Sequence, residues 1–395
     1  MDCKAGARER LEHFRYPLVD LSHRIHAHPE LGWEEEKASR WVAETLSDAG
    51  FRVQLGVFDL PTAVIARAGS GPLNIAFCAE YDALPEIGHA CGHNVIAAMS
   101  VGAAIAAARV ADDIGVTVTL LGTPAEEVGN AAGKMLMLER GAFDGVHAAM
   151  MAHTAPIDRA TFPLIAGAMF DITYTGREAH ASASPEQGIN AADAMVVAQT
   201  AIGLLRQHIR STDRIHGIVT KAGTAFNVIP ALSAAKYMAR STTIEQLKSL
   251  IPRVHRCFEA GAIATGCSIR IDGGDKPYAE MVDDIELATI YRRNAQSLGR
   301  TFIDFEGGPA ASTDMGNVSQ VIPSIHPAIG INSLPAVNHQ PDFTAHCIRE
   351  PADKAVFDGA LSLANTAVEA ASEGSLRQRL MSRQTAERTK SYTVS

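Results

Sequence analysis

Three short apolar runs constrain the fold of this chain most, because each of them leads directly into acidic or histidine side chains. The runs are residues 73–79 (LNIAFCA), 116–123 (VTVTLLGT) and 148–152 (AAMMA). Their length and composition predict buried strands, and the Ala-rich stretch 95–109 between the first two predicts a helix. This alternation indicates an α/β fold with a mixed, largely parallel sheet that is covered by helices.

Polar side chains follow each of the three predicted strands. In order along the chain these are Glu80 and Asp82, then Glu126 and Glu127, then His153. Ligands of such folds bind at the carboxyl ends of the strands. We therefore expect these side chains to meet in one site.

The middle of the chain has a different pattern. Strand and helix signals follow the order β-α-β-β-α-β, which predicts a compact α+β, ferredoxin-like module. We interpret residues 168–277 as an inserted lid and dimerisation domain, and residues 1–167 with 278–395 as a discontinuous metal-binding catalytic domain. The segment from Ser372 onward is polar, and we expect it to be a frayed tail. The predicted elements are 169–175, 189–209, 215–222, 234–241, 244–264 and 268–272.

Length and charge narrow the classes of function. A chain of 395 residues favours two domains, and 47% hydrophobic residues are enough for ordinary globular cores. The net charge of −9 argues against nucleic acid or an anionic membrane as a partner. The N-terminal residues have mixed charge instead of the apolar stretch of a signal peptide, so we expect a cytoplasmic protein whose six cysteines are reduced.

The densest chemical signal is the segment 88–94 (GHACGHN), which contains Cys91 and His93. Soft and borderline metals favour such ligands, although a buried Cys near a His is more often structural. Asn94 is the expected N-cap of the following helix. By itself the segment leaves a metal role undecided.

The other candidates strengthen the metal interpretation to different degrees. Glu126 and Glu127 could divide metal binding and proton transfer between them, whereas an isolated acidic pair would be a solvated helix start. His153 ends a buried strand, where a His is costly unless it is paired or liganded. His339 is in a loop, and the pattern of residues leaves its role open.

With these segments the chain resembles the co-catalytic metallopeptidases and amidohydrolases of peptidase family M20, whose members include aminoacylases and aminobenzoyl-glutamate hydrolase. The resemblance extends in family order over nearly the whole chain, and it is greatest to the dipeptidase-like and aminobenzoyl-glutamate-hydrolase-like branch. One departure is Asn94, where many relatives have Asp. The matching segments are 25–32 (IHAHPELG), 79–85 (AEYDALP), 89–94, 124–127 (PAEE), 179–180 with 188–191, 226–230 (FNVIP) and 312–319 (STDMGNVS).

The resemblance implies a role for each candidate residue. Glu126 would be the general base, His180 an oxyanion donor, and Asp82 would orient a metal ligand. Asn227 and Arg240 would bind a substrate carboxylate, although Arg240 could also be a surface cation at a strand end. The implied metal ligands are Cys91, His93, Glu127, His153 and His339.

The function implied is hydrolysis of an amide bond in a small N-acyl amino acid or dipeptide-like substrate that has a free carboxylate. Two divalent ions, Zn or Mn, would be bridged by water and by Cys91 or Glu127, and would make hydroxide available. We expect a homodimer in which His180 reaches the neighbouring subunit. Alternatives are hydrolysis of another C–N bond such as an aryl amine, a Cys91 thiol hydrolase with His93 or His89 as base, and an inactive binding protein.

Overall fold

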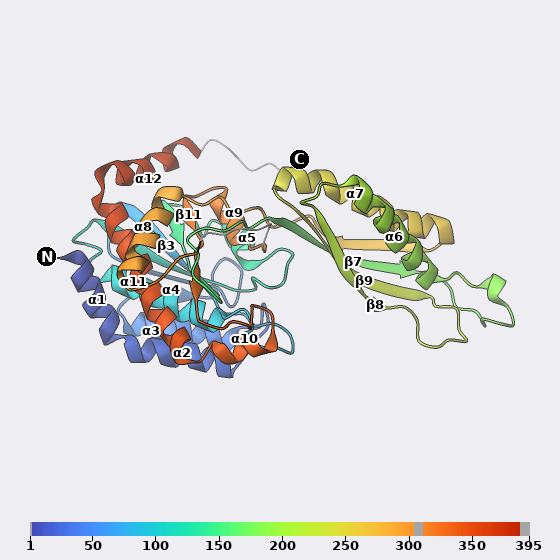
Figure 1. Cartoon of the computed structure of the whole chain (residues 1–395), viewed down its shortest axis with the longest axis horizontal. Coiled ribbons are helices and arrows are strands. Elements are labelled where there is room, and N and C mark those ends of the chain that lie inside the picture. The colour runs from blue at the N-terminus through green and yellow to red at the C-terminus, as the bar shows by residue number, and fades with distance from the viewer. Residues whose placement is uncertain (1, 304–310, 388–395) are drawn as a thin grey trace.

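Six strands form the central sheet of the larger of two lobes (Figure 1). The computed structural model describes residues 2–303 and 311–387. The strand order is β1-β2-β4-β3-β5-β11, and β4, β3, β5 and β11 run parallel to one another while β1 and β2 are antiparallel to their neighbours. The sheet is therefore mixed and mostly parallel, as predicted. Its strands are β1 (Arg52–Leu55), β2 (Val64–Ala68), β3 (Leu73–Glu80), β4 (Val116–Thr123), β5 (Ala148–Met150) and β11 (Ser324–Ile325).

Helices cover both faces of this sheet, which explains why its central strands are apolar throughout. In β3, Ile75 and Phe77 pack in the cluster that contains α4 (His93–Ala108) and α11 (Glu350–Ser372). The intervening Ala76 and Cys78 pack on the other side with α5 (Gly133–Glu139) and α9 (Met315–Ser319). The remaining helices of this lobe are α1 (Cys3–His13), α2 (Arg15–Ala27), α3 (Glu36–Asp48), α8 (Ile285–Ser297), α10 (Pro341–His346) and α12 (Gly374–Glu387).

The expectation of a frayed tail from Ser372 was wrong for residues 374–387, which form α12. Leu376 and Leu380 are buried in the main cluster. The guanidinium of Arg377 donates to the carbonyl oxygens of Ile114 and Gly115 at 2.7 and 2.9 Å. Two apolar side chains and Arg377, together with Arg379 paired to Asp284, therefore anchor a helix of low mean hydropathy. Residues 388–395 lie outside the described part.

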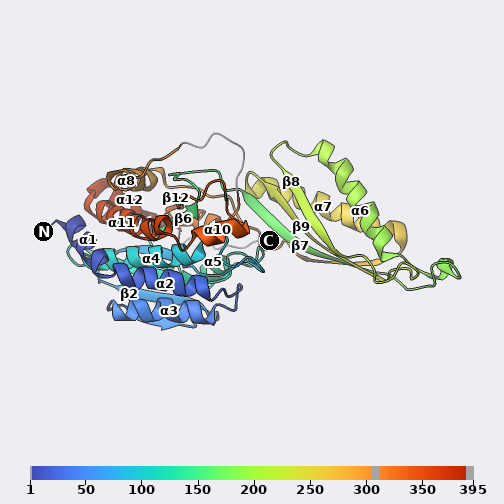
Figure 2. The same ribbon diagram turned by 60° about the horizontal axis from the view of Figure 1, so that its bottom comes forward.

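The smaller lobe contains a second sheet with the order β10-β7-β9-β8, in which all neighbours are antiparallel. Helices α6 and α7 cover one face of it (Figures 1 and 2). A separate hydrophobic cluster, with Phe170, Tyr174 and Phe258 among its members, fills the space between them. The elements are β7 (Ala166–Thr175), α6 (Ala191–Leu205), β8 (Arg214–Lys221), β9 (Leu232–Ser241), α7 (Ile244–Thr265) and β10 (Ser268–Gly273), with short 3-10 turns at Pro185–Gln187 and Arg206–His208.

The third predicted strand is shorter than expected. It ends at Met150, and His153 begins a new strand, β6 (His153–Ala155), which pairs with β12 (Ala328–Gly330). The chain leaves the central sheet here because its next partner is β12 and not β3. No helix in the described ranges is long and apolar enough to cross a membrane.

Candidate metal centre

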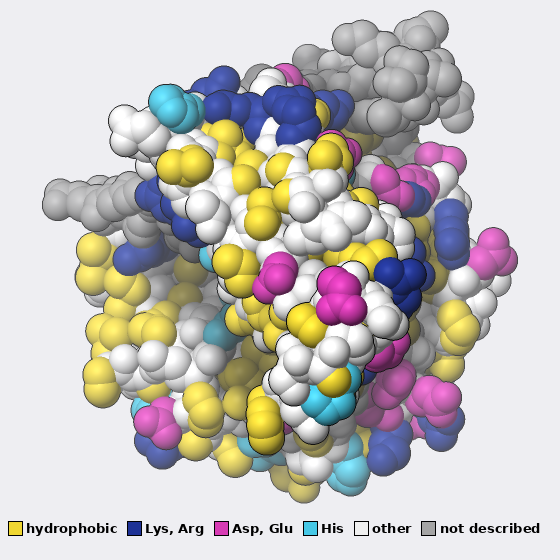
Figure 3. Space-filling model, turned by 90° about the vertical axis from the view of Figure 1, so that its right-hand side faces the viewer, with side chains coloured by type: hydrophobic (Ala, Val, Ile, Leu, Met, Phe, Trp, Pro, Cys, Tyr) yellow, Lys and Arg dark blue, Asp and Glu magenta, His cyan; other side chains and the backbone are white. Residues whose placement is uncertain are grey.

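The predicted metal ligands gather with Asp82 and Glu126 at the carboxyl edge of the central sheet. Glu80 at the end of β3 pairs in register with Thr123 at the end of β4, so the segments that follow both strands begin side by side. A cavity of about 900 Å³ opens here between the two lobes. On the face seen in Figure 3, hydrophobic side chains border a hollow beside the smaller lobe.

Asp82 orients His93. Nδ1 of His93 lies 2.9 Å from Oδ1 of Asp82, and the other oxygen of the same carboxylate accepts the N–H of Glu127 at 2.9 Å. Because Nδ1–H donates to Asp82, the neutral form of His93, which a metal ion would bind, has its lone pair on Nε2. That atom is buried and has no hydrogen-bond partner among the described residues.

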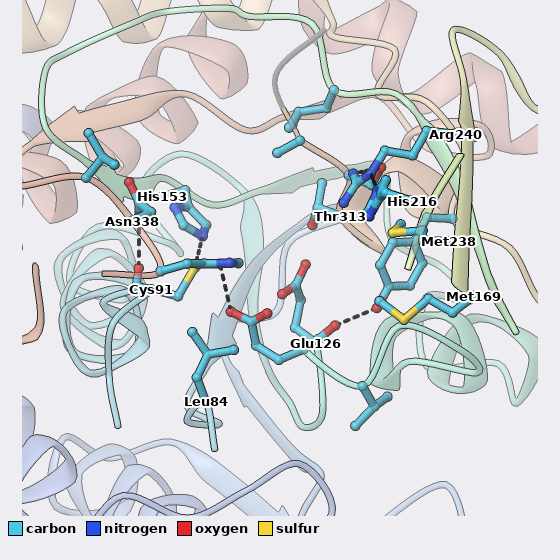
Figure 4. A pocket seen from close by; sticks show the side chains of 18 of the residues that line it. Leu84, Cys91, Glu126, His153, Met169, His216, Met238, Arg240, Thr313 and Asn338 are labelled. Carbon is cyan, nitrogen blue, oxygen red and sulfur yellow. Dashed lines mark hydrogen bonds and ion pairs between the residues drawn. The ribbon is translucent and has the colours of Figure 1, made fainter. Parts of the chain in front are cut away.

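Cys91 and His153 form a second pair. Nε2 of His153 lies 3.4 Å from Sγ of Cys91, and Nδ1 lies 2.8 Å from the carbonyl oxygen of Thr154. The hydroxyl of Thr154 donates to the carbonyl oxygen of Cys91 at 2.6 Å. The His153 ring therefore turns the lone pair of Nε2 toward the thiol (Figure 4).

Glu127 and His339 form a third pair near Cys91. Nε2 of His339 lies 3.4 Å from Oε1 of Glu127. The N–H of His339 donates to the carbonyl oxygen of Ala90 at 2.9 Å, which fixes the loop against the Cys91 segment. His339 has φ +67°, so this loop conformation is one that few side chains adopt freely.

The five predicted ligands and Glu126 thus form overlapping groups. In each group the ligand atoms lie within 4.8 Å of one another, a spacing that one ion can bridge. The free Nε2 of His93 and the mixture of thiol, imidazole and carboxylate donors fit divalent metals of the Zn and Mn kind. The groups are Cys91, His93 and His153; Cys91, Glu127 and His339; and His93, Glu126 and Glu127.

Burial dominates the electrostatics of the site. It raises the pKa of Glu126 well above its usual range, and the negative charges of Glu80 and Glu127 add to this effect. Burial also lowers the pKa of His153 to about 4, so this ring is neutral at pH 7. The Cys91 thiol has a pKa well above its ordinary value, because of burial and the charge of Glu127. A nearby cation would favour the thiolate of Cys91.

The smaller lobe contributes the far wall of the cavity. Arg240 on β9 lies opposite Glu126 in Figure 4, and its Nη1 donates to Oγ of Ser312 at 2.7 Å. Nε of Arg240 donates to the His216 ring at 3.3 Å. Met169 and Met238 also line this wall. Of the residues predicted in this lobe, only Arg240 lines the cavity of its own chain.

His180 and Asn227 lie elsewhere, in two loops at the far end of the smaller lobe. The N–H of Ala181 donates to the carbonyl oxygen of Asn227 at 3.0 Å, and Nδ1 of His180 accepts the N–H of Ala183 at 3.1 Å. Neither residue lines the cavity: the part of β7 that does so is Met169 to Asp171, whereas His180 follows the end of the strand at Thr175. Both side chains are exposed.

The expected N-cap role of Asn94 was wrong. Helix α4 already begins at His93, and Gly92 with φ +79° precedes it. A Cβ at Gly92 would meet Oγ1 of Thr154 at 2.2 Å, so only glycine fits there. Asn94 is buried, and its amide donates to Oγ of Ser22 and to the carbonyl oxygen of Cys347 at 2.9 and 3.0 Å.

Sequence reasoning missed two buried residues at the site. His326 follows β11, and its ring lies 5.4 Å from that of His153 between centroids. Burial lowers the pKa of His326 to about 3. Its place after the apolar run 321–325 (VIPSI) is the same strand-end signal that marked the other candidates. Lys134, which contacts Glu80, had no such signal, because a Lys in a first helical turn is usually exposed.

Comparisons with known proteins agree with this geometry. The chain is 37% identical over 384 residues to an Xaa-Arg dipeptidase of Mus musculus, and the match covers 93% of this chain and 88% of that protein. It is 31% identical over 282 residues to one component of the p-aminobenzoyl-glutamate hydrolase of Escherichia coli (strain K12), covering 66% of this chain and 58% of that protein.

The fold is also shared with solved structures. One is a dinuclear metal-binding peptidase of the M20 family from Bacillus subtilis, with a TM-score of 0.66, 24% identity and coverage of 91% of this chain and 99% of that chain. The family model described as Peptidase family M20/M25/M40 matches residues 76–354. A match over this much of the chain shows that the protein is a metallopeptidase or amidohydrolase of peptidase family M20/M25/M40.

Proposed function

We propose that the protein hydrolyses an amide bond in a small N-acyl amino acid or dipeptide-like molecule with a free carboxylate. The observation that carries this proposal is the Asp82–His93 pair, which leaves a buried imidazole lone pair beside Cys91, Glu126 and Glu127. The names of the relatives, a dipeptidase and a hydrolase of aminobenzoyl-glutamate, support the same class of substrate.

Two divalent ions would be held by the five predicted ligands. The first group of ligand atoms joins Cys91, His93 and His153, and the second joins Cys91, Glu127 and His339. Cys91 belongs to both groups, so it would help to hold both ions. When bound, Zn or Mn would activate water and polarise a carbonyl group.

Glu126 would transfer the protons. Its carboxylate takes a proton from water as the water oxygen bonds to the carbonyl carbon of the amide. As the C–N bond breaks, Glu126 gives this proton to the departing amine nitrogen. Burial raises the pKa of Glu126 and so favours the acid form that returns the proton, whereas bound cations would favour the carboxylate that takes it.

Arg240 would bind the carboxylate of the substrate. It lines the cavity wall opposite Glu126, and a guanidinium can contact a carboxylate through two N–H groups. Ser312 keeps one of these nitrogens in place. In this proposal residues 168–277 are the inserted lid, with the catalytic domain made by 1–167 and 278–395, so that lid and metal ligands meet across the cavity.

A homodimer would complete the site. His180 and Asn227 do not line the cavity of their own chain, so we infer that they act in the partner's site. The edge strand β8 supports such an assembly. Ile218 and Val219 on β8 are 64% and 38% exposed, and an open apolar edge strand pairs readily with another chain.

The two alternative reactions differ in what they require. Hydrolysis of another C–N bond, such as that of an aryl amine, would use the same metals and Glu126. A thiol hydrolase would need an ionised Cys91 without metal, and burial of that thiol with its raised pKa disfavours this. The amide reaction is therefore our preferred proposal.

A hydrolysis panel tests this proposal. Purified protein with added Mn²⁺ or Zn²⁺ is offered N-acyl amino acids, dipeptides and aryl amines, each with and without its free carboxylate. We expect turnover of carboxylate-bearing amides that is lost with a chelator and restored by metal. Turnover that survives complete metal removal would instead support the thiol mechanism.

A further inference from the structure

Lys134 is a fully buried lysine beside the proposed general base. Its side chain is 0% exposed, and Nζ lies 2.5 Å from Oε1 of Glu80 and 2.6 Å from Oδ1 of Asp314. Burial by itself would lower the pKa of Lys134, but the charges of Asp314 and Glu80 raise it well above its usual value. The ammonium is therefore charged and fixed between two carboxylates.

Three carboxylates converge around this ammonium. Oxygen atoms of Glu80, Glu126 and Asp314 lie within 4.8 Å of one another, and all three side chains are buried. Such a group would attract a cation if it had none. Because Nζ of Lys134 already contacts two of the three carboxylates, its ammonium supplies the positive charge that a metal ion would otherwise supply.

Lys134 also joins three segments that surround Glu126. Glu80 ends β3, Lys134 lies in the first turn of α5, and Asp314 immediately precedes α9. The carboxylate of Asp314 holds Lys134 twice, since its Oδ2 accepts the N–H of Lys134 at 2.8 Å. Ser312, the partner of Arg240, is two residues before Asp314. The lysine thus connects the base side of the cavity to the wall that contains Arg240.

The second oxygen of Glu80 lies near a proposed metal ligand. Oε2 of Glu80 is 3.5 Å from Nε2 of His93 and has no hydrogen-bond partner among the described residues. If Lys134 did not hold the other oxygen, Glu80 would be free to turn toward the metals. The contact between Lys134 and Oε1 therefore limits how far the carboxylate of Glu80 can move toward the proposed metals.

We propose that Lys134 is a positioning residue whose ammonium is a built-in cation, which keeps a further metal ion out of the Glu80–Asp314 pair and holds both carboxylates beside Glu126. This inference rests on the proposed function, in which Glu126 transfers protons. It predicts two opposite effects when the charge is removed. Binding of divalent cations becomes stronger, because an uncompensated negative charge remains, while turnover falls, because the surroundings of Glu126 shift.

The test compares Lys134→Met, which keeps an unbranched side chain of similar length but removes the charge, with Lys276→Met. Lys276 forms an exposed ion pair with Glu139 at 2.5 Å, so it is a matched lysine outside the cavity. Mn²⁺ binding is measured by titration calorimetry and hydrolysis by kcat and KM. We expect Lys134→Met to bind an additional Mn²⁺ ion or to bind Mn²⁺ about tenfold more tightly, and to lose about a hundredfold in kcat. Lys276→Met should match the wild type in both.

Unchanged or weaker Mn²⁺ binding by a folded Lys134→Met protein, or an unchanged kcat, would overturn the inference. If that variant does not fold, the triple variant Lys134→Met, Glu80→Gln, Asp314→Asn removes the charge imbalance. We expect the triple variant to fold, to bind no additional Mn²⁺ and to retain a low kcat; a wild-type kcat in it would show that Lys134 serves folding only. If the wild type hydrolyses no amide but Lys134→Met still gains Mn²⁺, the proposed function fails and the built-in cation stands.

Discussion

Asp82 and His93 are joined by a 2.9 Å contact between Oδ1 and Nδ1, and both side chains are 0% exposed. The same carboxylate accepts the N–H of Glu127. One buried acid therefore fixes the ring of one proposed ligand and the backbone of another. This arrangement predicts that Asp82 controls metal affinity without contacting metal.

Replacing Asp82 by Asn should weaken metal binding by about 10- to 100-fold, the usual effect of losing such an orienting partner. The measurement is titration of the metal-free protein with Zn²⁺ or Mn²⁺. Asp144→Asn is the control, because Asp144 is exposed and lies outside the cavity. Equal affinities of the two variants would contradict the orienting role.

Mutation should distinguish the roles of the two adjacent glutamates, Glu126 and Glu127. Glu126→Gln removes the base but none of the five proposed ligands, so we expect it to keep both ions and to lose on the order of a hundred- to ten-thousandfold in kcat. Glu127→Gln should lose metal as well. Metal content and kcat are measured on the same preparations, and a fully active Glu126→Gln protein would refute the proposed mechanism.

Mixing of subunits tests the position of His180. His180→Ala and Glu126→Gln proteins should each be inactive, and after subunit exchange about half of the chains should be in mixed dimers, each with one intact composite site. Partial activity should therefore return. The control mixture, Glu126→Gln with Glu127→Gln, should stay inactive because both defects lie in the same lobe. If the subunits are shown to exchange and no activity returns, His180 does not act in the partner's site.

Glu35 makes stability depend on pH. It accepts hydrogen bonds from the hydroxyl of Thr62 and the N–H of Ala125, and burial, with the charge of Asp82, raises its pKa from 4.5 to about 7. A raised pKa means that the folded state holds the proton more tightly than the unfolded state. The contribution is therefore complete below pH 4.5 and is lost as the pH rises to about 7.

The expected loss is on the order of 3–4 kcal/mol in the free energy of unfolding, from about 1.4 kcal/mol per pKa unit. Glu35→Gln should lack this dependence, while Glu34→Gln, at the exposed neighbouring position, should behave as the wild type. Denaturant unfolding at about pH 4 and about pH 8 measures the difference. Parallel pH profiles of wild type and Glu35→Gln would rule out this role.

The local pattern of the sequence was enough to predict three of the six strands of the central sheet and several of the polar residues that meet at its edge. Residues 73–79 and 116–123 are apolar because helices cover both faces, and that requirement is visible in composition alone. The polar residues after those strands, Asp82 and Glu126 among them, were found for the same reason, since parallel strands end at one edge. The spacing of Cys91 and His93 within one segment is likewise a local property.

Features that depend on contacts between distant segments were not readable from the sequence. Lys134 is buried only because Glu80 and Asp314, 54 and 180 residues away, surround its ammonium. His153 lies at the start of β6 and not at the end of β5, because β6 pairs with β12, which comes from the C-terminal part of the chain. His180 lies outside the lining of its own cavity because β7 continues beyond the lining residues to Thr175. Sequence patterns record how much apolar surface a segment must bury, whereas the partner that buries it, or that neutralises a charge, is decided only when the chain is folded.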